Sequence, residues 1–141
     1  MQRARRQDYN SDYEWGKARE IECLPQIRDF FNPELKITKK TYAPYDYWAK
    51  GLRVELKSRT NSRTAYNCTL ISLTKVEFAK GKPKIDSYFV FDFKDAYSLY
   101  YIKYDEKLFK TFKITEKIRL DRGKLEKNYY VNIPIYKLKE M

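Results

Sequence analysis

The sequence predicts a mixed α/β fold (α+β), and three stretches carry this prediction. Residues 13–31 place apolar side chains at helical spacing, residues 45–59 have the pattern of a β-hairpin, and residues 85–104 are rich in the aromatic and branched side chains of strands. Because helical and extended patterns share one short chain, we expect helices packed against a sheet.

Length and composition indicate one folded domain. The chain has 141 residues, of which 43% are hydrophobic and 17% aromatic. This is enough for a proper core and excludes a mostly disordered chain. We place the domain at residues 13–141 and a basic flexible arm at residues 1–12, which include Arg3, Arg5 and Arg6.

Several classes of protein and of site are disfavoured by what the sequence lacks. No apolar run approaches the roughly 20 residues of a membrane span, and no apolar segment follows the basic N-terminus, so we expect an intracellular protein that is neither secreted nor in a membrane. Two cysteines, Cys23 and Cys68, suit a reducing compartment. The absence of histidine excludes Cys–His zinc sites and Ser–His triads.

The formal net charge of +11 predicts an anionic partner, either a nucleic acid or a membrane surface. Arginine and tyrosine are interleaved through the chain. Since Arg and Lys bind phosphate and tyrosine rings stack on bases, nucleic acid is the favoured partner. The alternative is a soluble basic protein whose charge has no specific partner.

The first element expected is a helix over residues 13–31. Residues 10–12 offer capping side chains before it, and Asn32-Pro33 ends it. Pro25 is expected to kink the helix or to split it in two. One face carries residues at steps of four, three and four, namely Glu20, Leu24, Ile27 and Phe31.

Glu20 is the unusual member of this face, because a carboxylate among inward-pointing residues is costly unless it meets a cation or hydrogen-bond donors. Arg19 and Glu22 do not share the face. Glu20 either lies at the edge of the face and reaches water, or points toward the acidic side of the hairpin that follows.

The hairpin at residues 45–59 has Lys50-Gly51 as its predicted loop. In the second arm, alternation places the aliphatic residues on one face and the charged residues on the other. The aliphatic set is Leu52, Val54 and Leu56, and the charged set is Arg53, Glu55 and Lys57.

With this loop, Ala49 lies opposite Leu52 and Asp46 lies opposite Glu55. Cross-strand Cβ atoms are about 4.5–5.5 Å apart, so the two carboxylates repel each other unless a cation lies between them. Lys57, on the same face, completes a group of two acids and one ammonium. The alternative is an ordinary solvated charged face, and a three-residue loop would separate the two acids.

The regions around the hairpin are less sharply patterned. We expect an extended segment at residues 35–42 and a basic loop or helix entry at residues 58–67. Residues 67–79 fit a helix face and also, over residues 69–73, a strand; we favour the helix. Gly81-Lys82-Pro83 is a break.

The remainder of the chain is predominantly extended. Within residues 85–104 we expect two strands, joined by a turn at residues 94–96. A short helix or turn at residues 105–111 and a loosely alternating segment at residues 112–120 follow. A turn at residues 121–124 and a last strand at residues 129–135 complete the chain, and Pro134 favours an edge or the end of that strand.

The order helix, acidic hairpin, helix, strands resembles the PD-(D/E)XK nuclease superfamily. Three motifs carry the resemblance: Pro44-Tyr45-Asp46 resembles the Pro-Asp half of the signature with one residue inserted, Glu55-Leu56-Lys57 matches the second half, and residues 16–20 resemble the first-helix motif of Holliday-junction resolvases. The resemblance covers roughly residues 13–80. It implies a central mixed β-sheet flanked by helices, a restriction-endonuclease-like core that the C-terminal strands extend.

The chemistry expected at this site is metal-dependent phosphodiester hydrolysis. Mg²⁺ prefers oxygen ligands and uses one or two carboxylates, so Asp46 and Glu55 are the candidate ligands. The resemblance implies the backbone carbonyl of Leu56 as a further ligand and Mn²⁺ as a substitute metal. Lys57 would orient or help deprotonate the water, or stabilise the transition state. Glu20 would bind through a water or complete a second metal site.

Five residues that flank this centre are candidates for gripping nucleic acid: Arg53, Arg59, Arg63, Tyr66 and Lys75. For Arg59 and Arg63 the alternative is a solvated loop without a partner.

The sequence therefore favours a Mg²⁺-dependent endonuclease. The resemblance implies DNA as its substrate, with junction or branched DNA as one candidate structure, and a homodimer for symmetric cutting. A short-site restriction or nicking enzyme competes within this class. The alternative from another class is a non-catalytic basic nucleic-acid-binding protein, which gives no reason for Asp46, Glu55 and Lys57 to cluster. A small protein–protein interaction domain is a third possibility.

Overall fold

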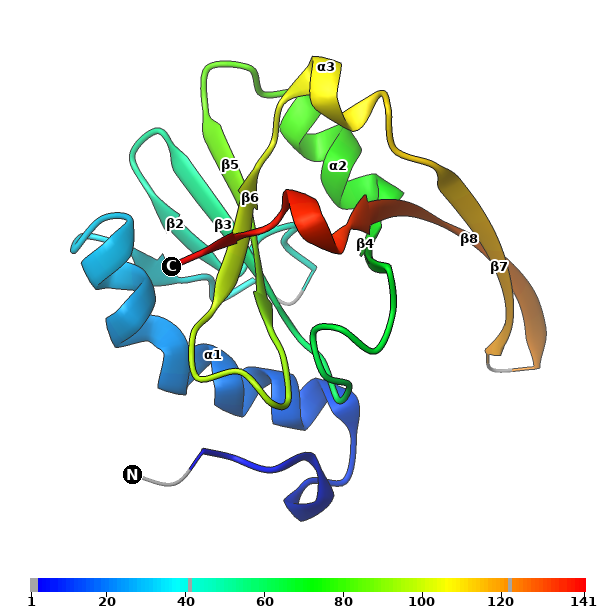
Figure 1. The fold of residues 1–141 in the computed structure, drawn as a ribbon, viewed down its shortest axis with the longest axis horizontal. Coiled ribbons are helices and arrows are strands. Elements are labelled where there is room, and N and C mark those ends of the chain that lie inside the picture. Colours follow the sequence, from blue (N-terminus) through cyan, green and yellow to red (C-terminus); the bar gives the residue numbers. More distant parts are fainter. Residues whose placement is uncertain (1–2, 41, 122) are drawn as a thin grey trace.

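The computed structural model describes residues 3–40, 42–121 and 123–141. It has the mixed α/β class that the sequence predicts, with two β-sheets and helices packed between and below them (Figure 1). The elements in chain order are η1 (Arg6–Asp8), α1 (Asp12–Phe30), β1 (Lys36–Ile37), β2 (Tyr47–Ala49), β3 (Leu52–Ser58), β4 (Cys68–Ser72), α2 (Leu73–Lys80), β5 (Asp86–Asp92), β6 (Tyr100–Lys103), α3 (Glu106–Phe109), β7 (Ile114–Asp121), β8 (Lys124–Pro134), η2 (Ile135–Lys137) and β9 (Lys139–Glu140). Within the described residues, none of the helices has the length and apolar content needed to cross a membrane.

The larger sheet is mixed and has the strand order β1-β2-β3-β5-β6-β9. β3 and β5 are parallel, whereas the other neighbouring pairs are antiparallel. A parallel pair needs a long connection, and β4 and α2 provide it here. The predicted central mixed sheet is therefore present.

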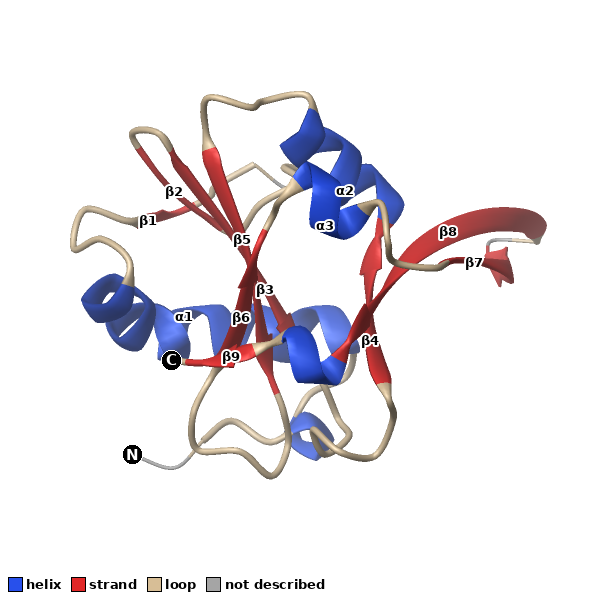
Figure 2. Cartoon of the chain, turned by 45° about the horizontal axis from the view of Figure 1, so that its top comes forward, coloured by secondary structure: helices blue, strands red, loops and turns tan. Residues whose placement is uncertain are grey.

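Helices cover the two faces of this sheet, as Figure 2 shows. On one face α1 packs through Cys23 and Ile27 against a cluster that includes Val54, Leu56 and Val90. On the other face α2, α3 and the smaller sheet enclose a second cluster, whose buried aromatic residues include Phe89, Phe91, Phe93, Phe109 and Phe112. Alternation along β3 and β5 supplies both faces, since successive side chains point to opposite sides.

The smaller sheet has the order β4-β8-β7 and was not expected. The prediction that the C-terminal strands extend the central sheet holds for β5, β6 and β9 and is wrong for β7 and β8. β8 begins earlier than expected and ends at Pro134, as predicted, but it is the middle strand of its sheet and β9 follows it. The predicted turn at residues 121–124 includes Arg122, which lies outside the described residues.

The favoured helix over residues 67–79 is wrong in its first half. Residues 68–72 form β4, and the helix α2 begins only at Leu73. Thr69 and Ile71 are buried on alternate positions and β4 pairs with β8. Cys68 pairs with Pro134, so the partner strand lies some sixty residues further along the chain. A pattern of neighbouring residues therefore cannot predict this pairing.

The first helix lies within one residue of its predicted range, but it is not split in two at Pro25. α1 runs without interruption through Pro25, and the Ser11 hydroxyl accepts a hydrogen bond from the Glu14 amide at its start. Arg19, which the helical spacing placed off the inward face, is nevertheless buried. Its guanidinium reaches the Asp92 carboxylate at the end of β5, with Nε to Oδ2 at 2.7 Å.

The residues before α1 lie against the body of the protein. The Arg3 guanidinium donates to the carbonyl of Phe93 at 2.9 Å, and the indole of Trp15 donates to the carbonyl of Ala4 at 2.9 Å. The carboxylate of Glu22 accepts from the Ala4 amide at 3.0 Å. These contacts join the N-terminal segment to α1 and to the loop after β5.

The hairpin has the predicted loop and register. Ala49 pairs with Leu52, and Gly51 has a φ of +71°, a left-handed conformation that glycine adopts without steric cost. Tyr47 pairs with Val54. Asp46 directly precedes β2, and it therefore reaches the position beside Glu55 and Leu56.

Candidate active site

A cavity of about 460 Å³ contains all four predicted catalytic residues, Glu20, Asp46, Glu55 and Lys57. α1 contributes Glu20, the segment before β2 contributes Asp46, and β3 contributes the other two. Lys75 of α2 also lines it. Four segments that are separate in sequence thus bring acids and amines to one cleft.

Asp46 is fixed beside β3 by two hydrogen bonds. Its amide donates to the carbonyl of Val54 at 2.9 Å, and its Oδ2 accepts from the amide of Leu56 at 2.7 Å. The amide and carbonyl of one strand residue point to the same edge, and the pairing of β2 with β3 ends at Tyr47 and Val54. The Leu56 carbonyl therefore lies on the edge that Asp46 occupies, beyond the last paired residue of β2.

Glu55 is buried, with only 3% of its surface exposed. Its Oε1 bonds the Lys75 ammonium and lies 3.6 Å from the Lys57 ammonium. Its Oε2 is buried and has no hydrogen-bond partner among the described residues. Burial, together with the nearby charge of Asp46, raises the pKa of Glu55 to about 8. Within the described residues, Oε2 of Glu55 thus lacks the cation or hydrogen-bond donor that a buried carboxylate oxygen requires.

The two lysines on Glu55 differ in their environment. Burial lowers the pKa of Lys57 from its ordinary value, even though the charge of Glu55 acts in the opposite direction. For Lys75, burial also lowers the pKa, but the charge and hydrogen bond of Glu55 outweigh it and the pKa is raised. Lys57 is therefore the amine that more readily gives up its proton.

Glu20 is buried at 8% exposure and does not lie at a solvated edge of the helix. Burial, followed by the charge of Asp46, raises its pKa to about 8, against the opposing effect of Lys17. The Lys17 ammonium lies 3.4 Å from Oε2 of Glu20. The Tyr47 hydroxyl donates to the Glu20 carbonyl at 2.6 Å and so ties this turn of α1 to the hairpin.

Sequence reasoning missed two features that shape this cleft. Lys17 was not selected, although its place three residues before Glu20 puts both on one helix face. The second feature is the carboxylate of Asp92, which accepts from Arg19, Arg3 and the Ser58 hydroxyl, the last at 2.8 Å. This network joins α1 to β3 and β5, and no local pattern announced it because its members are far apart in sequence.

The predicted nucleic-acid contacts lie in three places. Arg59 and Lys75 line the cleft. Arg59 donates to the carbonyl of Leu70, and burial lowers its pKa. Arg53 lies outside the cleft, where its guanidinium stacks on the ring of Tyr45 at 4.9 Å.

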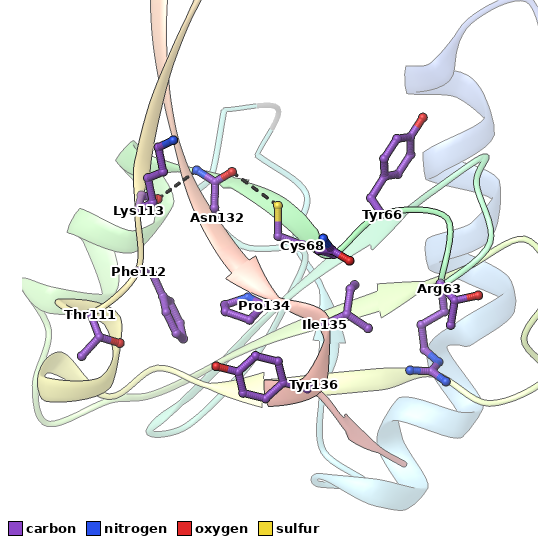
Figure 3. A pocket seen from close by; sticks show the side chains of 12 residues that line it. Arg63, Tyr66, Cys68, Thr111, Phe112, Lys113, Asn132, Pro134, Ile135 and Tyr136 are labelled. Atoms are coloured by element: carbon purple, nitrogen blue, oxygen red, sulfur yellow. Dashed lines mark hydrogen bonds between the residues drawn. The ribbon is translucent and has the colours of Figure 1, made fainter.

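Arg63 and Tyr66 lie beside a second, larger cavity of about 680 Å³ (Figure 3). It is formed by the loop before β4, the bases of β4 and β8, and the segment after α3. None of the four predicted catalytic residues lines it. The Arg63 guanidinium lies 4.9 Å from the centre of the Tyr100 ring. The larger cavity is therefore distinct from the cleft that holds the acids.

The donors of the cleft fit a magnesium ion in number and in kind. In residues 3–40, 42–121 and 123–141, no three Cys, Asp or Glu side chains converge closely enough to hold a metal by themselves. Two carboxylates, Asp46 and Glu55, and the Leu56 carbonyl offer oxygen ligands, which suits Mg²⁺ because this ion retains several waters. Oε2 of Glu55, which is buried and lacks a partner within residues 3–40, 42–121 and 123–141, is an atom that such a cation would satisfy.

The cleft can hold a cation and an anionic group side by side, because both acids and amines line it. A scan against known protein families and a search of curated proteins each find no match to this chain.

Proposed function

We propose that the protein is a divalent-metal-dependent endonuclease that hydrolyses phosphodiester bonds in DNA, with a restriction-endonuclease-like core of the PD-(D/E)XK type. The observation that carries the proposal is the convergence of Asp46, Glu55 and Lys57 with Glu20 in one cleft. Burying carboxylates is costly unless cations or donors meet them. A protein that only bound nucleic acid would gain nothing from this arrangement.

Asp46, Glu55 and the Leu56 carbonyl are the residues that would hold Mg²⁺, with Mn²⁺ as a substitute. A divalent ion held there would neutralise charge on the scissile phosphate and lower the pKa of a bound water. The chain meets the conditions for this, since one carboxylate oxygen of Glu55 is buried and has no hydrogen-bond partner in the part of the chain that the structure describes.

The protein's own groups have separate roles in the proposed reaction. Lys57, whose pKa is lowered, takes or relays a proton from the attacking water. Glu20, held near Asp46 by α1, orients that water. Lys75 and Arg59 are the cleft cations placed to meet the phosphate backbone.

DNA is proposed over RNA on the strength of the family resemblance, and the net charge of +11 supports a polyanionic substrate. The strand order around β3, with an antiparallel β2 on one side and a parallel β5 on the other, supports the restriction-endonuclease-like core. Cutting of both strands would require two copies of the cleft.

The test is a cleavage assay with labelled duplex, single-stranded, flap and four-way-junction DNA, each with Mg²⁺, with Mn²⁺ and with EDTA. We expect metal-dependent cutting that falls at least roughly 100-fold in Glu55→Gln and in Lys57→Met, because each removes a group at the reacting centre. The matched controls are Glu106→Gln and Lys103→Met, which alter an exposed acid and an exposed lysine away from the cleft.

The preferred substrate would separate a junction nuclease from a short-site restriction or nicking enzyme. Binding of DNA without cutting under every metal condition, unchanged in Glu55→Gln and Lys57→Met, would instead favour the non-catalytic nucleic-acid-binding protein. Circular dichroism of each variant establishes that a loss of cutting is not a loss of fold.

A further inference from the structure

The hairpin formed by β7 and β8 projects from the body of the protein (Figures 1 and 2). β4 pairs with β8 only over residues 130–134. Residues 116–121 and 124–129 therefore form a two-stranded extension, called the arm below. At about 3.3 Å per residue it reaches roughly 20 Å from the sheet. An isolated two-stranded hairpin is marginally stable in water, so an arm of this length gains from a covering partner.

One face of the arm carries an apolar stripe. In β7 the alternate residues point to one side, and the register places the partners of β8 on that same side, with Leu120 opposite Leu125. The stripe consists of large apolar side chains that are between 44% and 76% exposed: Ile114, Ile118, Leu120, Leu125 and Tyr129. At its base it continues into the buried core through Val131.

The opposite face of the arm is polar. It carries Lys117, Arg119, Lys124, Glu126 and Asn128. The arm is therefore amphipathic although both of its faces are exposed. A contiguous apolar surface rimmed by polar residues is typical of a protein–protein contact.

Charge indicates which partner fits the stripe. The stripe's face carries one acid and one base, Glu116 and Lys127, which pair at 3.7 Å. A nucleic acid would be held by unpaired cations, which this face does not supply among the described residues. Two copies of a chain with net charge +11 repel each other, and the repulsion is least where a surface has no net charge.

The pattern is also complementary to itself. When two arms face each other about a two-fold axis, the leucines at the tip and the isoleucine and tyrosine nearer the base provide apolar surface on both sides. Glu116 of one copy can then meet Lys127 of the other. A symmetric contact therefore removes the apolar side chains of both stripes from water without any surface from a different protein.

We infer that the arm is a homodimerisation element, and that its occupant is the arm of a second copy of this chain packed face to face. The stripe has five large apolar side chains, fewer than the roughly 20–30 residues that each partner contributes to a standard interface, so the dimer dissociates on dilution. The inference depends only on the arm and does not require that the protein cuts DNA, because the experiment measures the mass of the particle in solution.

The experiment is sedimentation velocity on DNA-free protein, from about 1 µM to about 300 µM, at low and at high salt. We expect a concentration-dependent shift from the 17.2 kDa monomer to twice that mass. We also expect the dimer to persist in high salt, because screening weakens the repulsion between the basic chains and leaves apolar contacts intact. The double variant Leu120→Glu, Leu125→Glu should remain monomeric over this range.

The matched control is Lys117→Gln, Lys124→Gln, which changes the net charge by the same amount on the polar face and should dimerise like the wild type. Hydrogen exchange on the wild-type protein supplies a readout that needs no variant: protection of residues 114–131 should rise with concentration. A wild type that stays monomeric, a double variant that still dimerises, or an arm whose exchange does not respond to concentration would each overturn the inference. Wild-type protein that stays monomeric but whose arm becomes protected on lipid vesicles or on DNA would assign the stripe to that partner instead.

Discussion

The two carboxylate oxygens of Glu55 have different surroundings in the cleft. Glu55 shares one oxygen between two ammonium groups and leaves the other without a partner among the described residues. Burial of this carboxyl group, and after it the repulsion with the charge of Asp46, favours the protonated form and raises the pKa of Glu55 to about 8. A metal ion and a proton thus compete for the same oxygens.

This competition predicts how stability depends on pH in the absence of metal. The pKa of Glu55 is about 8 in the folded protein and near its ordinary value of 4.5 when unfolded, so between these values the folded state binds the proton more tightly. Protonated Glu55 therefore stabilises the folded state, and this stabilisation is fully present below pH 4.5. It decreases as the pH rises and is lost once the pH passes 8, and the free energy of unfolding falls by up to about 1.4 kcal/mol per pH unit.

The measurement is urea unfolding in EDTA at intervals from pH 5 to pH 8, for wild type and for Glu55→Gln. The variant has no carboxyl group to ionise at this position, so its stability relative to wild type should improve steadily with pH. Parallel profiles for the two proteins would show that Glu55 ionises normally in the folded state.

At the scale of elements, the position of α1 decides whether Glu20 reaches the hairpin. The helix is held by Tyr47, by its apolar contacts, and by the buried pair of Arg19 with Asp92. Ser58 at the end of β3 joins the same carboxylate. A change in this network should therefore affect both stability and the geometry of the cleft.

We predict that Arg19→Met lowers the free energy of unfolding by about 3 kcal/mol, because it leaves a buried carboxylate with fewer partners. The control is Arg5→Met, which removes an exposed ion pair with Asp8 and should change stability by less than about 0.5 kcal/mol. Denaturant unfolding at neutral pH gives the free energy of unfolding of the wild type and of both variants. Similar losses in both variants would mean that the Asp92 network does not hold α1.

At the scale of the whole molecule, the dominant property is the charge of +11. Its cations are not confined to the cleft: Arg53 and Arg63 lie on other surfaces. Such a distribution favours contact with an extended polyanion over a compact ligand.

Binding to duplex DNA should accordingly weaken steeply with salt. A plot of log K against log salt concentration should fall by roughly 0.9 for each phosphate that the protein neutralises, and by roughly 0.7 per phosphate for single strands. Fluorescence anisotropy in EDTA separates this binding from cutting. Affinity that is independent of salt would contradict an electrostatic contact with the backbone.

The sequence by itself determined the elements whose signals are local. α1 followed from its cap and helical spacing, and the hairpin followed from Lys50-Gly51 and strict alternation. Because the loop sets the register, the approach of Asp46 to Glu55 could also be predicted. Asp46, Glu55 and Lys57 line one cleft for this reason, whereas Glu20 joins them through the packing of α1.

Only the tertiary structure decided the features that depend on distant partners. β4 is a strand because β8 pairs with it, and Arg19 is buried because the Asp92 carboxylate accepts its hydrogen bonds. Lys75 reaches Glu55 because α2 packs into the cluster that includes Phe89 and Phe91 of β5, the neighbour of β3. Helical spacing and alternation describe neighbours within a few residues. Pairing of strands and burial of charges are decided by groups tens of residues away, so no local pattern can specify them.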